Sequence, residues 1–156
     1  MSNSYFKQCK CSENEKKRYL SRLSGPLLER MDLFVFVPPV PLENLQNKNL
    51  QSESSKEIKI RVEKAREIQL ERFKDKRIFC NGQMSHRDIM DQCNISSDAL
   101  NLLDKIYKKF DISARVYDRI LKISRTIADL DESKSINRSH VIEALQYRRF
   151  INKEII

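Results

Sequence analysis

The first position that suggests chemistry is Arg115, an arginine in the first turn of a predicted helix. Ser113 is the expected N-cap, and a basic residue two positions later opposes the helix dipole, so the helix gains nothing from it. A helix N-terminus and an arginine together, however, form a good seat for a phosphate. The alternative is a surface ion pair between Arg115 and Asp118, three residues further along the helix.

Arg30 is the second such position, between a short apolar helical turn and the apolar run 33–37. A guanidinium is costly to bury in such surroundings, so it must either reach outward or pair with an acid. The acids closest in sequence are Glu29 and Asp32. A structural ion pair with one of them at the end of the turn is therefore the alternative to an outward-facing, functional arginine.

The pair Cys9 and Cys11 has the C-x-C spacing of half a tetrahedral zinc site. Such a site needs four ligands, and the other two are not nearby in the sequence. Cys80, His86 and Cys93 could complete it only if the fold brought them close. Thiols without a metal are the simpler interpretation.

The glycine content limits what the chain can catalyse, since Gly25 and Gly82 are its only two glycines. The phosphate-binding patterns G-x-x-x-x-G-K-[ST] and G-x-G-x-x-G are therefore absent, and the chain cannot build a glycine-loop nucleotide site by itself. Neither His86 nor His140 lies near a serine, cysteine or carboxylate pattern that suggests nucleophilic catalysis. Both fall in predicted first turns and are interpreted as surface or capping residues.

The charge balance favours anionic partners. The 156 residues contain 30 Lys and Arg against 22 Asp and Glu, a net charge of +8. Such a surplus suits nucleic acid or nucleotide phosphates, although it also serves solubility. No secretory signal follows Met1, and no stretch approaches the roughly 20 apolar residues that span a bilayer. We therefore expect a cytoplasmic, reduced protein with neither disulfides nor a membrane anchor.

The N-terminal part, residues 1–40, reads as the edge of an α/β domain. Gly25 and Pro26 begin a short helix, because proline is tolerated in the first helical turn. The run 33–37, LFVFV, has the β-branched and aromatic residues of a strand buried on both faces, and two prolines end it. One buried strand needs a sheet, so the other strands are expected outside this chain.

The C-terminal part, residues 57–151, reads as an all-α bundle that follows a linker at 41–56 rich in Asn, Gln and Ser. Apolar residues recur at helical spacing through this part, separated by short polar turns. Each predicted helix has its own N-cap, and the first is a capping box with Glu57. The predicted caps are Ser54, Ser85, Ser96 or Ser97, Ser113 and Asn137. The fold class is therefore mainly α, an incomplete α/β edge followed by a helical bundle.

Four segments carry a family resemblance. GPLLER and the following Asp32 and strand resemble the arginine-finger segment of magnesium-chelatase-like AAA+ ATPases of the competence-protein type (ComM and YifB). Three further segments resemble, in the same order, that family's connector into its lid, its lid helix and its last helix: residues 79–84, 113–130 and 143–148. Together they cover nearly the whole chain from about Cys9 to Arg149.

The resemblance implies roles for individual residues. Arg30 matches the arginine finger, which acts in trans on the nucleotide of a neighbouring subunit. Arg115 matches the sensor-2 arginine, which contacts the nucleotide phosphates bound by its own subunit. Cys9 and Cys11 match the second half of a cysteine cluster. The family's phosphate loop and its Mg²⁺-holding acidic motif correspond to sequence upstream of Met1.

The implied whole is a ring, expected to be a hexamer, that uses ATP and Mg²⁺ to drive a motor on DNA in competence and recombination, of the branch-migration type. This chain would need a phosphate-loop-bearing segment or subunit as partner, and alone it is predicted to be inactive and to bind no ATP. The alternative is a non-enzymatic basic helical module that binds nucleic acid or a partner protein.

Overall fold

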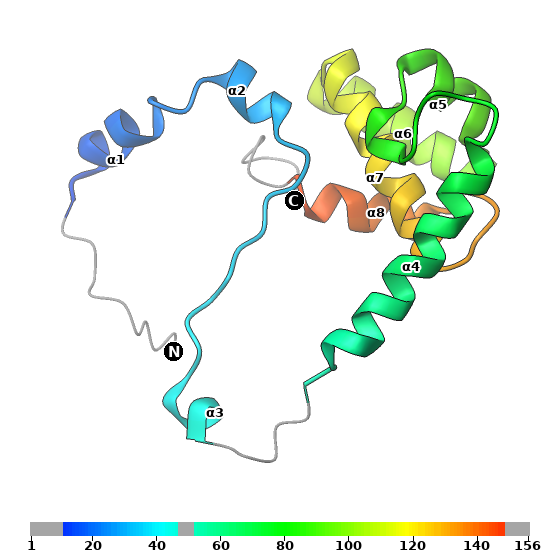
Figure 1. Cartoon of the computed structure of the whole chain (residues 1–156). Coiled ribbons are helices and arrows are strands. Elements are labelled where there is room, and N and C mark those ends of the chain that lie inside the picture. The colour runs from blue at the N-terminus through cyan, green and yellow to red at the C-terminus, as the bar shows by residue number, and fades with distance from the viewer. Residues whose placement is uncertain (1–10, 47–51, 149–156) are drawn as a thin grey trace.

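The computed structural model describes residues 11–46 and 52–148, and this part of the chain is mainly α-helical (Figure 1). Predictions for residues 1–10, 47–51 and 149–156, Cys9 among them, lie outside the described part. The elements follow one another in the order α1 (Glu13–Leu20), α2 (Gly25–Arg30), α3 (Leu42–Gln46), α4 (Ser55–Arg72), the 3₁₀ turn η1 (Asn81–Gln83), α5 (His86–Gln92), α6 (Ser97–Phe110), α7 (Ala114–Leu130) and α8 (Arg138–Gln146).

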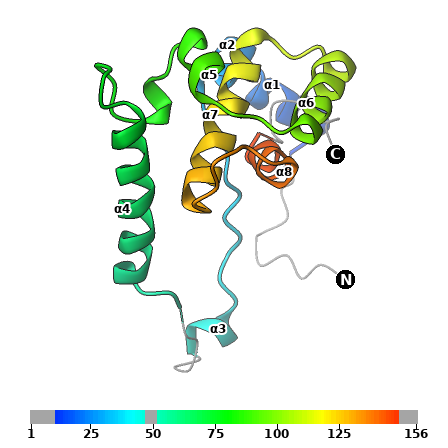
Figure 2. The same ribbon diagram turned by 90° about the vertical axis from the view of Figure 1, so that its right-hand side faces the viewer.

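Helix α7 is the centre of a small bundle. It packs against α8, α4, α5 and η1, while α6 packs against α8 (Figure 2). Apolar residues from α5, α6, α7 and α8, together with Phe73 after α4 and Met84 after η1, form one buried cluster, which also includes Ile89, Leu121 and Val141. A single parallel bridge between Ile95 and Ile136 ties the loop before α6 to the loop before α8. The predicted helical bundle is therefore confirmed.

The predicted caps set where these helices begin. Ser54 accepts a hydrogen bond from the backbone N–H of Glu57, whose carboxylate accepts one from the backbone N–H of Ser54. Ser85 forms the same reciprocal box with Asp88. Ser96 and Ser113 each accept from the third residue beyond them. These bonds satisfy amide groups that the first turn of a helix leaves without partners.

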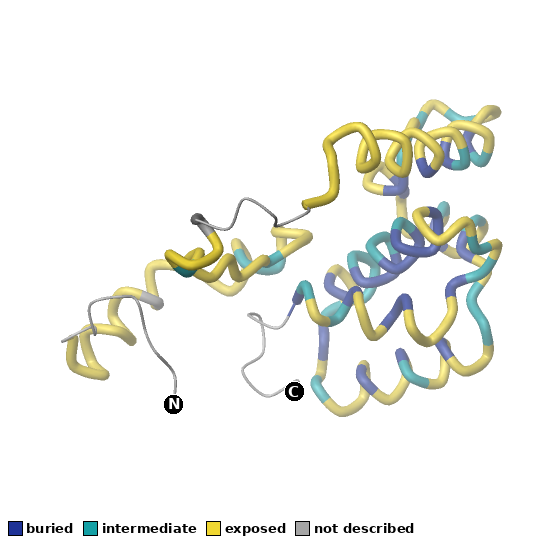
Figure 3. The backbone as a smooth tube through the Cα atoms, turned by 90° about the horizontal axis from the view of Figure 1, so that it is seen from below, coloured by how far each residue is buried: buried dark blue, intermediate teal, exposed yellow. Residues whose placement is uncertain are grey.

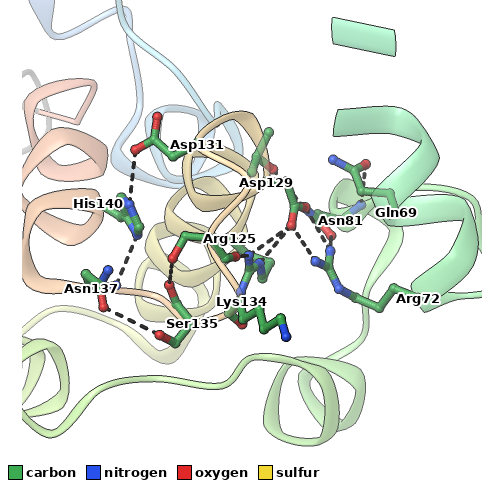
Figure 4. A network of polar contacts seen from close by, with 12 residues as sticks. Gln69, Arg72, Asn81, Arg125, Asp129, Asp131, Lys134, Ser135, Asn137 and His140 are labelled. Carbon is green, nitrogen blue, oxygen red and sulfur yellow. Dashed lines mark hydrogen bonds and ion pairs between the residues drawn. The ribbon is translucent and has the colours of Figure 1, made fainter. Parts of the chain in front are cut away.

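A buried polar network joins α4 to α7 (Figure 4). The carboxylate of Asp129 accepts hydrogen bonds from Arg72 (2.8 Å), the Asn81 amide (2.7 Å) and Arg125 Nε (3.0 Å). The remaining guanidinium nitrogens of Arg125 donate to two backbone carbonyls in the turn after α7. Burial raises the pKa of Asp129, but the hydrogen bonds from Arg72 and Asn81 outweigh it and bring that pKa below its ordinary value.

His140 differs from its interpretation as a surface residue, because it is buried in the first turn of α8. Its Nδ1 accepts from the backbone N–H of Asn137 at 3.0 Å, which makes it a capping residue. Its Nε2 lies 3.1 Å from the carboxylate of Asp131. Since Nδ1 is the acceptor, Nε2 carries the proton that is shared with Asp131.

The strand predicted at 33–37 does not form in the described residues. This run is extended and forms no ladder. Four of its five residues are exposed, with Phe36 73% and Val37 78% exposed, and Phe34 is half-buried (Figure 3). The physical reason is that a strand needs a neighbour to take its backbone hydrogen bonds, and the described part of the chain supplies no second strand. The described residues are therefore mainly α-helical, as predicted, but without the expected strand.

Only part of the apolar face of α4 is buried. Ala65 is buried against the bundle, but Ile58 and Val62 in the N-terminal half of α4 remain exposed. Figure 2 shows this half of α4 extending away from the other helices. Within the described ranges, 11–46 and 52–148, no helix is both long and apolar enough to cross a membrane.

Candidate functional site

The N-terminal end of α7 borders a surface hollow of about 600 Å³. It is lined by the first three turns of α7, by η1 and the start of α5, and by the chain after α2. The lining residues are Asp32, Gly82, His86, Ala114, Arg115, Asp118, Arg119 and Lys122. Four of these side chains are basic or can become so, which suits an anionic ligand.

Arg115 is exposed at this hollow, in the first turn of α7. Asp118, the acid that could have paired with Arg115, contacts His86 instead. Asp118 Oδ1 lies 2.8 Å from Nδ1 of His86, at the start of α5. The alternative of an Arg115–Asp118 pair is therefore wrong, and within the described residues Arg115 has no carboxylate partner.

The other carboxylate at the hollow is engaged as well. Asp32 forms an ion pair with Arg119, which lies one helical turn after Arg115 on α7. Lys122, a further turn along, donates a hydrogen bond to the backbone carbonyl of Gly82 at 3.1 Å. Both acidic side chains of the hollow therefore contact residues other than Arg115.

Arg30 ends α2, where it is exposed. The ion pair with Asp32 that the sequence left open is not formed, because Asp32 pairs with Arg119 instead. Among the described residues, 11–46 and 52–148, none forms a hydrogen bond or ion pair with the Arg30 side chain. Arg30 does not line the hollow of Arg115. The structure therefore presents two separate outward-facing arginines rather than one combined site.

The chain after Arg30 is fastened to the bundle by two residues that the sequence analysis did not single out. Arg148, just after α8, donates from Nη1 to the carbonyls of Met31 (2.7 Å) and Asp32 (3.1 Å). The backbone N–H of Phe34 donates to the carbonyl of Tyr147 at 2.8 Å. These partners lie more than 110 residues apart in the sequence, so no local pattern could reveal them.

The proposed zinc ligands are spread over the molecule. Cys11 is exposed, Cys80 is half-buried before η1, and Cys93 lies in the bundle core. Burial raises the pKa of the Cys93 thiol to about 11, and the nearby arginines only partly oppose this. Among the described side chains, no three His, Cys, Asp or Glu residues gather as a metal site would require. Cys9 lies outside that part, so the half-site at Cys9 and Cys11 stays a prediction.

Two family patterns match this chain. The family described as "Magnesium chelatase, subunit ChlI C-terminal" matches residues 52–148. The family described as "Magnesium chelatase, subunit ChlI" matches residues 2–45. The first match covers the helical bundle with α7 and Arg115, and the second covers α2 and Arg30.

Curated relatives resemble the chain over nearly its full length. It is 41% identical over 140 residues to the competence protein ComM of Haemophilus influenzae, which is 90% of this chain and 27% of that protein. The uncharacterized protein YifB of Escherichia coli is 37% identical over 139 residues, 89% of this chain and 27% of YifB. An uncharacterized protein of Mycobacterium bovis is 30% identical over 141 residues, with 90% and 28% covered. The chain thus spans about a quarter of the length of the relatives it matches.

Proposed function

This chain belongs to the magnesium chelatase ChlI C-terminal family, and on that premise we propose that it is the C-terminal segment of a ComM-type AAA+ ATPase. It supplies two arginines to nucleotide hydrolysis. Arg30 is the arginine finger, which acts in trans on the nucleotide of a neighbouring subunit. Arg115 is the sensor-2 residue, which acts on the nucleotide of its own subunit.

The observation that supports this proposal is that neither arginine forms an ion pair with an acid close to it in the sequence. Asp32 is engaged by Arg119, and Asp118 is engaged by His86. Arg30 and Arg115 are both exposed, and neither forms an ion pair among the described residues. A guanidinium that is to bind phosphate must be free of a competing carboxylate, and both of these arginines meet that requirement among the described residues.

The chemistry of both roles suits arginine. Phosphoryl transfer places charge on the transferred group, and a fixed guanidinium fork stabilises that charge in the transition state. Arg115 has the further advantage of a position in the first turn of α7, where the helix dipole also favours an anion. Arg30, at the end of the short helix α2, can reach across to another subunit because no described side chain covers it.

The remaining parts of the ATPase are assigned to the three quarters of the relatives that this chain does not match. With two glycines the chain has no phosphate loop, so ATP and Mg²⁺ would be held mainly by an upstream segment or a partner subunit. When bound there, Mg²⁺ neutralises charge on the transferred phosphate. The exposed apolar run 33–37 would then pair with that segment as a strand of its sheet, which covers the side chains now in solvent.

The proposed whole protein is a homo-oligomeric ring, expected to be a hexamer, that moves on DNA in competence and recombination. The name of the Haemophilus influenzae relative supports the competence role. The net charge of +8 suits a DNA partner.

A chimera tests this proposal: the chain replaces the segment of Haemophilus influenzae ComM that it matches. ATP hydrolysis and nucleotide affinity are then measured separately. Arg30→Ala should lower kcat by about a thousandfold or more, as other arginine fingers do, and leave nucleotide affinity unchanged. Arg115→Ala should weaken nucleotide binding about tenfold through loss of a charge-assisted hydrogen bond. The matched control is Arg66→Ala, since Arg66 is an exposed arginine on α4, away from the hollow.

The contrary result is equally specific. If the chimera hydrolyses ATP and Arg30→Ala behaves like Arg66→Ala, Arg30 is not a finger. If Arg115→Ala also leaves nucleotide affinity intact, the chain contributes nothing to the nucleotide site. Binding to duplex DNA that falls steeply with salt and ignores ATP would then favour the basic interaction module.

A further inference from the structure

The finger segment meets the lid helix through a set of contacts that lie two residues beyond Arg30. Asp32 forms its ion pair with Arg119 of α7, and Arg148 donates to the backbone carbonyls of Met31 and Asp32. Phe34 donates its backbone N–H to Tyr147. Within the described residues, these polar contacts hold the chain that follows α2 against α7 and the end of α8.

Arg148 is an unusual residue to find in this position. It is only 2% exposed, and its Nε and Nη2 have no hydrogen-bond partner among the described residues. Burial, and then the nearby charge of Arg119, lowers the pKa of Arg148 to about 10, while Glu29 opposes that shift. By donating to the carbonyls of Met31 and Asp32, the buried guanidinium of Arg148 fixes the backbone just after Arg30. Burying the charged group has a considerable desolvation cost. Such a residue suggests that the position itself matters.

We propose that Arg119 and Arg148 are positioning residues for the arginine finger, and that they couple Arg30 to the lid helix that carries Arg115. This inference rests on the proposed function and deepens it. Arg115 and Arg119 lie four residues apart on α7, and therefore on the same face of one rigid helix. Asp32 lies two residues after Arg30. Any displacement of the start of α7 is thus passed through Arg119 and Asp32 to the finger.

The consequence is a link between two nucleotide sites of the ring. Arg115 acts on the nucleotide of its own subunit, and Arg30 acts on that of the next. When Arg115 binds or releases a nucleotide phosphate, α7 shifts, and this shift changes the direction in which the Arg30 side chain points. The ion pair between Arg119 and Asp32 is a side-chain contact, so it can break and reform as α7 moves without unfolding either element.

The first test uses the full 156-residue chain and measures only how firmly the segment after α2 is held against α7 and the end of α8. The readout is hydrogen exchange of the Phe34 amide by NMR, because that amide donates to the carbonyl of Tyr147 and so reports directly on the contact between the chain after α2 and the end of α8. Arg119→Gln and Asp32→Asn should each speed its exchange by about fivefold, the value of one partly exposed ion pair. The charge swap, Asp32→Arg with Arg119→Asp, should restore part of the protection. Arg61→Gln, which breaks the exposed pair with Glu53, is the matched control and should leave the Phe34 amide unchanged.

The second test adds the ATPase chimera described above. Arg119→Gln should lower kcat by about tenfold or more with the melting temperature and nucleotide affinity retained, and the charge swap should recover part of the loss. A purely structural role would instead lower the melting temperature together with kcat.

The possible failures are distinguishable. An unchanged Phe34 amide in Arg119→Gln overturns the attachment, whatever the chimera does. A faster amide with normal kcat, in a chimera that Arg30→Ala disables, overturns the positioning role and leaves the finger intact. A chimera that Arg30→Ala does not affect overturns both the finger and its positioning.

Discussion

Replacement of Asp129 by asparagine tests how the bundle is held together. The Asp129 side chain is fully buried on α7 and is the shared acceptor for Arg72, Asn81 and Arg125. Asparagine has the same shape but no charge, and its amide nitrogen would face donor groups. The change therefore removes one partner from a buried ion network while the two guanidiniums remain.

The magnitude follows from the burial of those guanidiniums. Arg125 is 1% exposed and the Arg72 side chain 13% exposed, so neither can recover its hydration without opening the packing of α4 on α7. Removing one partner of a buried pair costs about 3–5 kcal/mol. A domain of this size is stable by about 5–15 kcal/mol in total. We therefore expect Asp129→Asn to remove a large part of the stability of the bundle.

Urea unfolding followed by circular dichroism at 222 nm measures this effect. With a slope of about 2 kcal/mol per molar urea, the midpoint should fall by about 2 M. The matched control is Asp91→Asn, at an exposed position on α5, which should stay within about 0.5 kcal/mol of the parent chain. A loss of less than about 1 kcal/mol in Asp129→Asn would refute the view that this network joins α4 to α7.

Three further predictions concern titration, thiol reactivity and capping. Because the pKa of Asp129 is lower in the folded chain than in the unfolded chain, its contribution is fully present above about pH 4 and is lost as the pH falls through the folded value; urea midpoints between pH 5 and 2 should therefore fall less in Asp129→Asn than in the parent. Burial holds the pKa of Cys93 at about 11, so iodoacetamide at pH 8 should alkylate it at least about tenfold more slowly than Cys80, and equal rates in the folded chain, read by mass spectrometry, would contradict its buried placement. Ser54→Ala removes the cap that Glu57 completes and should cost about 1 kcal/mol, seen as faster exchange of amides in the first turn of α4; unchanged amides there would mean that packing rather than capping holds that turn.

Local signals in the sequence predicted the helices well. A cap depends on one side chain and an amide three residues away, so Ser54, Ser85 and Ser113 could each be recognised without knowledge of the fold. Arg30 and Arg115 are both exposed. Their assigned roles, and the division into domains at 40 and 57, stay predictions.

Signals that depend on distant partners could not be recognised. The Arg72–Asp129 and Asp32–Arg119 pairs join residues 57 and 87 positions apart, and a charged residue looks the same in sequence whether it is buried or solvated. The expected strand at 33–37 failed for a related reason. Its composition reports what it would bury if a sheet were present, and the described residues contain no sheet.

The central claim is that Arg30 acts on the nucleotide of a neighbouring subunit, and mixing two inactive chimeras tests it most directly. One chimera carries Arg30→Ala with an intact phosphate loop in its ComM part. The other carries a disabled phosphate loop with Arg30 intact. Each should be inactive alone. We predict that mixed rings recover ATP hydrolysis, because the intact loop of one subunit then faces the Arg30 of another. Mixed rings that stay as inactive as either parent, although the subunits are shown to exchange, would contradict the claim.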